Sequence, residues 1–232
     1  MLSVEKLSVS YGRVRALDAL DLTLGEAGAL HGIIGPNGAG KSTLLDAVTG
    51  RRAPTQGRVR YRGEDITRKS IAWRRRRGLS RSFQRTSIFP DLTVREQIEL
   101  IARRLGDARY GEAIEAMGLA EYLDEKAARI AYGVQRRIDV ALALIGRPQT
   151  LLLDEPGAGL SAEETMRLFL HLRDLAAERG IAAIVVEHDV EAVFACCATV
   201  TVLDLGRHLA TGAPAAIRGD ARVVAAYLGS AA

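Results

Sequence analysis

The segment that most restricts the fold of this chain is Gly-Pro-Asn-Gly-Ala-Gly-Lys-Ser at residues 35–42. It matches the pattern G-x-x-x-x-G-K-[ST], with a short apolar run at residues 32–34 before it and a predicted helix over residues 42–49 that ends at Gly50. Glycines in such a turn direct backbone N–H groups around an anion, and the helix adds the positive end of its dipole. The segment therefore predicts a phosphate-binding loop rather than a simple glycine-rich turn. The Lys41 ammonium is expected to contact the outer phosphates.

A phosphate loop also needs an acidic group for a metal ion, and residues 150–155 supply a candidate. Residues 150–153 are apolar enough for a strand buried on both faces, and two acids follow at its carboxyl end, where α/β proteins bind ligands. Asp154 is expected to hold Mg²⁺, directly or through water, together with the Ser42 hydroxyl. Glu155 is placed to orient or deprotonate an attacking water. The alternative is an acidic strand end at the surface. The pair predicts hydrolysis of a nucleoside triphosphate, because a second carboxylate directly after the metal acid is typical of ATPases.

The composition is that of a globular protein too short for two large domains. The chain has 232 residues, of which 48% are apolar and 26% charged, and its formal net charge is +4. The most apolar stretch, residues 192–203, is shorter than a bilayer crossing, and residues 1–11 lack a long apolar block. We therefore expect neither a transmembrane helix nor a secretory signal. Cys196 and Cys197 are adjacent and lack metal-ligand spacing, so they are interpreted as reduced core thiols of a cytosolic protein.

Hydrophobic periodicity divides the chain into strands and helices. The first thirty residues and residues 59–62 alternate between apolar and polar, which predicts antiparallel strands with one solvated face. Helices are expected over residues 135–145 and 162–179, buried strands over 150–153 and 181–186, and a hairpin over 199–211. This alternation predicts an α/β fold with a mostly parallel sheet and an antiparallel β subdomain. Together with the phosphate loop, the pattern resembles a P-loop NTPase of RecA-like type.

The middle of the chain has a different pattern. Residues 89–133 are mostly helical in periodicity and carry no strong strand signal, so they are expected to form a small helical subdomain. Residues 1–88 and 134–232 then form the antiparallel and RecA-like parts, and residues 1–232 make up a single ATP-binding domain.

In order and spacing, the motifs resemble those of the ATP-binding subunits of ABC transporters over nearly the whole chain. The matching segments are Tyr11, residues 35–43, Ser82-Phe83-Gln84, residues 132–136, Asp154-Glu155-Pro156, Gly159-Leu160-Ser161 and His188. The resemblance implies ATP and Mg²⁺ as cofactors. It implies metal contacts from Ser42, Gln84 and Asp154. It also implies nucleotide contacts from Tyr11, Gly35, Pro36, Asn37, Gly38, Ala39, Gly40, Lys41, Ser42 and Thr43.

Within this family the chain is most similar to the LivG-type subunits of branched-chain amino acid importers. The shared features are residues 82–84 followed by 88–94, a tyrosine at 132, residues 157–160 and the ending 226–229. The resemblance implies an ATPase that drives import of branched-chain or other amino acids or amides. It implies a peripheral position at the cytoplasmic face of the membrane. The implied partners are a second ATPase subunit bound head to tail, as a heterodimer or homodimer, membrane permease subunits and, indirectly, a solute-binding protein.

Three single residues take their roles from the resemblance. Gln84 is expected to touch the metal or the water and to report the nucleotide state to the helical subdomain, although a polar loop residue is the alternative. His188 is expected to hydrogen-bond the γ-phosphate and to hold Glu155. Tyr11 is expected to stack on adenine, although a turn or core aromatic is the alternative. The other histidines lack such a context and are interpreted as structural: His31, His171 and His208.

The chain departs from the family at the signature, which is usually Leu-Ser-Gly-Gly-Gln, or Leu-Ser-Tyr-Gly-Gln in this subtype. Residues 130–134 read Ile-Ala-Tyr-Gly-Val, so Ala131 lacks the serine hydroxyl and Val134 lacks a polar group. What remains for the partner's nucleotide is the backbone around Ala131, Tyr132 and Gly133 and a helix expected to start near Gln135. One lost hydrogen bond to a charged group costs roughly 1.5–3 kcal/mol.

This departure leads to a hypothesis about the dimer. Each site in the family is shared between one subunit's phosphate loop and the other's signature, so an asymmetric heterodimer with one strong and one weak ATP site is expected. A regulatory or weakly catalytic subunit is the alternative, which the intact Glu155 and His188 disfavour. An ABC-type ATPase acting on DNA or ribosomes is a further alternative. Such proteins commonly carry long coiled coils or two linked cassettes, which do not fit in 232 residues.

The densest basic run is a row of four arginines at residues 74–77, with Arg68, Lys69, Arg81 and Arg85 nearby in the sequence. A solvated helix face is the first interpretation. Attraction to anionic lipid headgroups or to acids on a membrane partner is the second. Nucleic acid is not an expected partner, because no aromatic stacking platform accompanies the run.

Overall fold

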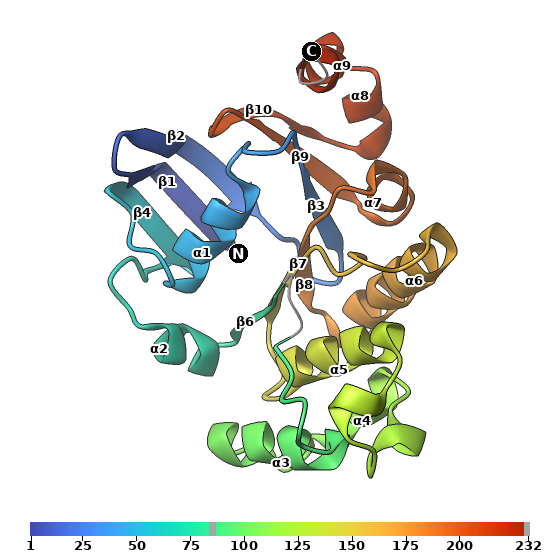
Figure 1. Ribbon diagram of the computed structural model, residues 1–232. Coiled ribbons are helices and arrows are strands. Elements are labelled where there is room, and N and C mark those ends of the chain that lie inside the picture. The colour runs from blue at the N-terminus through green and yellow to red at the C-terminus, as the bar shows by residue number, and fades with distance from the viewer. Residues whose placement is uncertain (84–86, 230–232) are drawn as a thin grey trace.

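The computed structural model describes residues 1–83 and 87–229 of the chain (Figure 1). The strands are β1 (Leu2–Tyr11), β2 (Val14–Leu24), β3 (Leu30–Ile34), β4 (Gln56–Tyr61), β5 (Glu64–Asp65), β6 (Leu79–Ser82), β7 (Thr150–Asp154), β8 (Ala182–Val186), β9 (Thr199–Asp204) and β10 (Arg207–Gly212). The α-helices are α1 (Lys41–Thr49), α2 (Ile71–Arg76), α3 (Val94–Leu105), α4 (Gly111–Ala116), α5 (Tyr132–Leu144), α6 (Ala162–Arg179), α7 (Val190–Cys196), α8 (Pro214–Arg218) and α9 (Ala221–Gly229). Two 3₁₀ turns, η1 (Ala120–Tyr122) and η2 (Ala127–Arg129), precede α5.

The central sheet is mostly parallel, as the sequence predicts. Within the described residues its strand order is β10-β9-β3-β8-β7-β6, and every pair is parallel except β9 with the final strand β10. Ile33 pairs with Val186, and Val186 pairs with Asp154. Because parallel strands end at the same edge of a sheet, this register brings the carboxyl ends of β3, β7 and β8 together.

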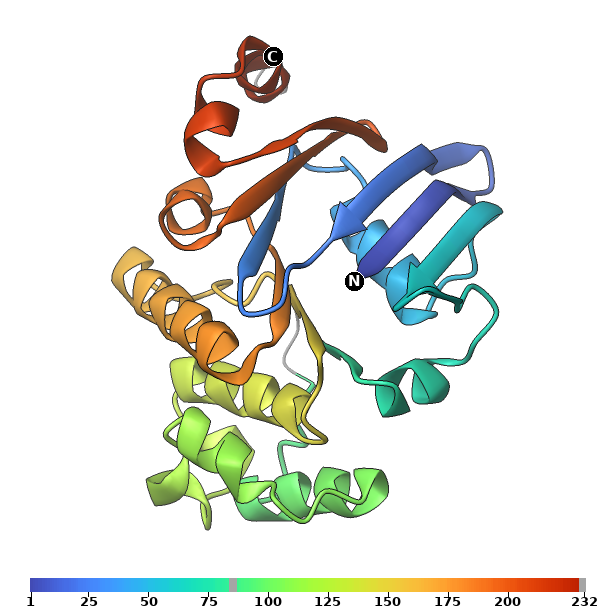
Figure 2. The ribbon, with the colours of Figure 1, turned by 180° about the vertical axis from the view of Figure 1, so that it is seen from behind.

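The predicted antiparallel part is a second sheet with the strand order β2-β1-β4-β5. It faces the central sheet across α1, and the two views in Figures 1 and 2 show the antiparallel sheet and the helical part on different sides of the central strands. Leu44 and Leu45 of α1 share one hydrophobic cluster with Leu7 of the antiparallel sheet and with Leu152 and Ile184 of the central sheet. The helix that follows the phosphate loop is therefore held between two sheets.

The other face of the central sheet packs against helices. Leu151 and Leu153 alternate with Leu152 along β7, and they belong to a second cluster that includes Phe169 of α6 and Ile138 of α5. A strand buried on both faces produces this division, because successive side chains point in opposite directions. Beyond α5 lie α3 and α4, at the bottom of Figure 1. Most of the core therefore lies on the two faces of one sheet.

One helix boundary was predicted wrongly. The sequence pattern places the start of α5 near Gln135, whereas the helix begins at Tyr132 with Ala131 as its N-cap residue. The backbone carbonyl of Ala131 accepts the N–H groups of Val134 and Gln135, so helical hydrogen bonding begins four residues before Gln135. Gly133 consequently lies in the first turn of the helix. A glycine there disguises the start of a helix, because glycine has a low helix propensity.

The solvated-face interpretation of residues 74–77 is wrong for Arg74, which is only 2% exposed. Its guanidinium donates to the carbonyls of Ala47 and Val48 in the last turn of α1, and it also bonds the carbonyls of Thr67 and Lys69. Burial lowers the pKa of Arg74 to about 10. The charge therefore serves as a C-terminal cap of α1 rather than as a lipid-facing group.

The next arginines in the run differ from one another. Arg75 donates to carbonyls at the C-terminal end of α5, those of Leu142, Ala143 and Ile145. Arg76 and Arg77 are exposed, as expected for a solvated face. The run therefore joins the ends of two helices through its first two members.

Two further expectations concern the membrane and the cysteines. Among the described residues, no helix is both long and apolar enough to span a bilayer. Cys196 and Cys197 are both free and buried, which confirms their interpretation as core thiols.

Candidate active site

The phosphate loop connects β3 to α1, and its glycines occupy conformations that side chains exclude. Gly40 has a φ of 97°, and a Cβ there would lie 2.6 Å from the carbonyl oxygen of Ala16. A Cβ on Gly35 would lie 2.1 Å from the carbonyl oxygen of Leu203. Both glycines are required for the loop to pack against its neighbours, which explains their spacing in the sequence. Asn37 and Gly38 at the tip of the loop are exposed.

Lys41 folds back over the loop. Its Nζ donates to the carbonyl oxygens of Gly35 at 2.6 Å and Pro36 at 3.0 Å, and the residue is only 6% exposed. Burial lowers the pKa of Lys41, while the charges of Glu155 and Asp154 raise it. A buried ammonium held on neutral carbonyls is electrostatically suited to an anion, because a phosphate would supply the missing counter-charge.

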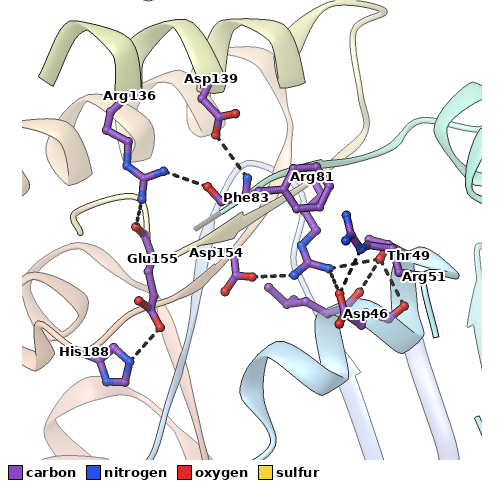
Figure 3. Close-up of polar contacts among 11 residues, drawn as sticks. Asp46, Thr49, Arg51, Arg81, Phe83, Arg136, Asp139, Asp154, Glu155 and His188 are labelled. Carbon is purple, nitrogen blue, oxygen red and sulfur yellow. Dashed lines mark hydrogen bonds and ion pairs between the residues drawn. The ribbon is translucent and has the colours of Figure 1, made fainter. Parts of the chain in front are cut away.

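Asp154 ends β7 beside the loop and is 3% exposed. Arg81 of β6 donates to its Oδ2 at 2.6 Å and to Asp46 Oδ1 of α1 at 2.6 Å, as Figure 3 shows. Asp154 Oδ1 is buried and has no hydrogen-bonding partner among the residues that the structure describes. A buried carboxylate oxygen without a partner is costly unless a cation or a water binds it, so this oxygen fits a divalent metal ligand.

Glu155 and His188 form a pair. His188 Nε2 lies 2.8 Å from Glu155 Oε1, as the close-up in Figure 3 shows. Glu155 is 8% exposed, whereas the His188 side chain is 47% exposed, so the histidine is the solvent-facing member. The backbone of Glu155 has a φ of 48°, which is uncommon for a residue with a side chain. Its N–H donates to the Val186 carbonyl at 2.8 Å, which ties it to the neighbouring strand.

Glu187, next to this pair, was not predicted as a site residue from the sequence. It is 5% exposed, and its two carboxylate oxygens accept the N–H groups of Gly157 and His188, both at 2.7 Å. Burial raises the pKa of Glu187, and hydrogen bonds from the backbone of His188, Gly157 and Asp189 oppose that rise. The carboxylate thus ties the loop after Glu155 to the loop that carries His188.

Two charged residues of α5 reach the chain on either side of residue 84. Asp139 Oδ2 accepts the Phe83 N–H at 3.2 Å, and Asp139 Oδ1 accepts the Ser87 N–H at 3.0 Å. Arg136 donates to the Phe83 carbonyl and to the Glu155 carbonyl (Figure 3). Gln84 itself, expected to touch the metal or the water, lies outside the described residues.

The remaining expected nucleotide residues lie in two places. Tyr11 ends β1, is 43% exposed, and has the Arg52 guanidinium 4.5 Å from its ring centroid. Ala131 caps α5 without a side-chain hydrogen bond. Tyr132 packs its ring against Gly159, where a Cβ would lie 2.7 Å from the ring. The signature therefore packs against the loop that follows Glu155.

The histidines interpreted as structural make protein contacts. His31 is buried, with Nε2 2.8 Å from Thr201 Oγ1. His171 and His208 contact the Ala116 carbonyl and Thr211 Oγ1.

Several residues of the site were missed in the sequence. Asp46 and Asp139 were not singled out, and Arg81 and Arg136 appeared only within a basic run or a motif. No local pattern reveals these pairs, because the partners lie far apart in the sequence: Arg81 is 35 residues from Asp46 and 73 residues from Asp154. One local hint existed: Arg81 is the charged residue in a short strand that otherwise carries uncharged side chains, which indicates a paired charge.

Comparison with known proteins identifies the family of the chain. The sequence profile described as ABC transporter matches residues 17–158, and the profile described as Branched-chain amino acid ATP-binding cassette transporter matches residues 207–232. The chain is 31% identical to the high-affinity branched-chain amino acid transport ATP-binding protein BraF of Pseudomonas aeruginosa, over 100% of this chain and 98% of that protein. It is 32% identical to LivG of Escherichia coli, a protein of the same description, over 100% and 98%. It is also 30% identical to the lipopolysaccharide export system ATP-binding protein LptB of Haemophilus influenzae, over 99% and 97%.

Solved structures give the same result. A structure of the ADP conformation of an ATP-binding cassette of an ABC transporter has a TM-score of 0.88 and 28% identity, covering 99% of this chain and 98% of that one. The dimeric structure of a bacterial ABC transporter cassette has a TM-score of 0.82 and 25% identity, covering 92% and 99%. The chain therefore belongs to the ABC transporter family. Within such a transporter it is the ATP-binding cassette, the component with ATPase activity.

Proposed function

We propose that this chain is the cassette that hydrolyses ATP to drive an importer of branched-chain amino acids. The observation that carries the catalytic part is the meeting of four side chains at one sheet edge. Lys41 begins α1 after the loop that follows β3, Asp154 ends β7 with Glu155 next to it, and His188 follows β8 at 2.8 Å from Glu155. This arrangement supports phosphate binding, metal binding and water activation in a single site.

Each residue of the site has a proposed role. Backbone N–H groups of residues 37–43 and the Lys41 ammonium bind the β- and γ-phosphates. Ser42, at the start of α1, and Asp154, with its partnerless Oδ1, are the proposed ligands of Mg²⁺, and Gln84 is proposed as a further contact. When bound, the metal neutralises the developing charge on the phosphate oxygens. Tyr11 is proposed to stack on the adenine.

Glu155 is the proposed general base. It accepts the proton of the attacking water at a carboxylate oxygen, and His188 at 2.8 Å holds that carboxylate in place and hydrogen-bonds the γ-phosphate. The left-handed backbone of Glu155 is anchored at its N–H and at its carbonyl, which fixes the point from which the side chain projects. Together with the His188 contact, this positions the carboxylate for the attacking water.

A second cassette completes the proposed active unit. In a head-to-tail dimer, the backbone at Ala131, Tyr132 and Gly133 and the N-terminus of α5 face the partner's nucleotide. Because Ala131 has no hydroxyl, the site that this chain completes is proposed to be weaker than its own. ATPase assays of the chain alone and with candidate partner cassettes test this asymmetry. Turnover by the isolated chain at the full rate of the complex would contradict it.

The proposed solute class rests on the similarity to BraF and LivG over their whole length. Overall identity to the export protein LptB is nearly as high, so the distinguishing observation is the match of residues 207–232 to the branched-chain profile. These comparisons do not favour a merely regulatory subunit. The proposed partners are permease subunits, at the cytoplasmic face of the membrane, and a solute-binding protein indirectly.

Glu155→Gln tests the catalytic proposal. We expect turnover to fall by more than about 100-fold, because the base is lost, while ATP affinity stays within a few-fold. Unchanged turnover would refute the assignment. The solute class is tested by reconstituting the chain with candidate permeases in liposomes. A binding protein loaded with leucine, isoleucine or valine should stimulate ATPase activity, and stimulation only by an unrelated solute would refute this class.

A further inference from the structure

Arg81 holds two carboxylates from different parts of the site. Its Nη1 donates to Asp46 Oδ1 and its Nη2 to Asp154 Oδ2, both at 2.6 Å, and the Arg81 side chain is 6% exposed. Asp46 lies on α1, the helix that begins at the phosphate loop, and Asp154 ends β7 (Figure 3). The guanidinium therefore links the phosphate-binding helix to the acid at the strand end.

The two oxygens of Asp154 differ as a result. Oδ2 is held by Arg81, whereas Oδ1 is buried and has no partner among the residues that the structure describes. A planar guanidinium sets the direction of the carboxylate that it binds, because its N–H groups have fixed geometry. Oδ2 is thus bonded to Arg81, and this bond also fixes the direction in which Oδ1 points.

We propose that Arg81 is a positioning residue for the metal, and that it orients Asp154 so that Oδ1 alone is presented to Mg²⁺. This inference rests on the proposed role of Asp154 as a metal ligand. Arg81 touches neither nucleotide nor metal, and acts through Asp154. Asp46 is the second member of this arrangement. Its negative charge offsets the guanidinium charge of Arg81 and so limits the repulsion between Arg81 and the cation.

Lysine cannot replace this arginine. A single ammonium on a flexible stem does not hold two carboxylates in a fixed plane. The aromatic ring of Phe83 restricts the arginine further, with its centroid 5.0 Å from the Arg81 guanidinium and 4.8 Å from that of Arg51. Arg51 also lies 3.6 Å from Asp46. Of these two arginines, however, only Arg81 contacts Asp154 in the described part of the chain. Arg51 is therefore a matched control.

The test compares the affinity of the chain for a fluorescent ATP analogue with excess Mg²⁺ and with EDTA. Arg81→Lys keeps the charge and removes the fork. We expect it to lower the Mg²⁺-to-EDTA affinity ratio roughly tenfold, which corresponds to about 1.4 kcal/mol. The affinity in EDTA should stay within about twofold, because the phosphate loop is unchanged. Arg51→Lys should leave both affinities unchanged.

Two further variants keep the inference falsifiable. If Arg81→Lys does not fold, Asp46→Asn should lower the same ratio by a smaller factor, because it loosens Arg81 without removing it. An Mg²⁺-to-EDTA affinity ratio equal to that of the wild type in Arg81→Lys would overturn the positioning role. If only Asp46→Asn folds, the same result in that variant would overturn it. A ratio above the wild-type value would also overturn it, because it would mean that charge repulsion dominates. Asp154→Asn is the reference: if it leaves the ratio unchanged, the proposed metal ligand itself is wrong. If Asp154→Asn removes the gain in affinity that Mg²⁺ gives while Arg81→Lys leaves that gain unchanged, only the role of Arg81 fails.

Discussion

Arg136 donates a hydrogen bond from its guanidinium to the backbone carbonyl of Glu155. The arginine lies in α5, the helix whose first turn carries the signature, and it is only 2% exposed. A second donor of the same group bonds the Phe83 carbonyl at 2.8 Å. The helix that is proposed to face the partner's nucleotide is thus tied directly to the proposed base of the chain's own site.

This contact predicts the effect of Arg136→Gln. Losing a charged donor loosens the backbone of Glu155, whose positive φ needs support, so we expect turnover to fall roughly tenfold. ATP affinity should change less than about twofold, because the phosphate loop is untouched. Steady-state ATPase kinetics and nucleotide titration check this. Arg137→Gln is the control, since Arg137 bonds the carbonyls of Met117 and Gly118 instead. Equal losses in both variants would contradict a specific link to Glu155.

Ala131→Ser should both stabilise α5 and strengthen the dimer. Ala131 is an N-cap residue without a side-chain hydrogen bond, and a serine there accepts an N–H of the first turn, worth about 1 kcal/mol. The hydroxyl also restores a donor toward the partner's nucleotide, so ATP-dependent dimerisation should tighten. Urea unfolding and size-exclusion chromatography with ATP measure the two effects. Ala128→Ser adds an exposed hydroxyl away from the cap and should change neither. A variant no more stable than the parent chain would argue against this capping geometry.

Arg74→Met should destabilise the fold far more than Arg76→Met. It leaves carbonyls at the end of α1 without their donor, and we expect the free energy of unfolding to fall by roughly 2–4 kcal/mol. Arg76 is exposed and lies in α2, the helix that also carries Arg74, so Arg76→Met should lower the free energy of unfolding by less than about 0.5 kcal/mol. Chemical denaturation of both variants makes the comparison. Similar losses at the two positions would show that burial of Arg74 is not what matters.

His31 makes stability depend on pH. Burial lowers its pKa from 6.5 to about 4. Nδ1 faces the Gly25 N–H and Nε2 faces Thr201, so a second ring proton would meet a donor. Between pH 6.5 and 4 the unfolded chain binds more protons at this ring than the folded chain, so stability falls as the pH drops through that window. The loss from pH 7 to 5 should be roughly 2 kcal/mol.

The measurement is urea unfolding across this pH range in His31→Gln and in the unmodified protein. The variant should lose less stability on acidification, whatever its stability at pH 7. His171→Gln, at an exposed position where the ring contacts the Ala116 carbonyl, serves as the control and should keep the original slope. An unchanged slope in His31→Gln would rule out His31 as the titrating group.

The local motifs were readable from the sequence because each is made by neighbouring residues. The phosphate loop needs only the glycines and Lys41 between a strand and a helix, and Asp154 with Glu155 needs only the end of an apolar strand. Their pairing with His188 was implied by the family resemblance, and the strand before each residue places both at the same edge of a parallel sheet. The sheet order and the two-sided burial of β7 agree with that reasoning.

Only the tertiary structure decided which charges meet. A run of arginines has no internal signal that separates the buried Arg74 from the exposed Arg76, because that difference depends on where the end of α1 lies. The same holds for Arg81, whose two carboxylates come from another helix and another strand. Charged side chains reach such partners across long stretches of sequence, and only packing determines which partner lies within a hydrogen bond. The catalytic motifs are therefore formed by neighbouring residues and can be read from the sequence. The charged contacts that hold them in place join distant residues and form only in the folded chain.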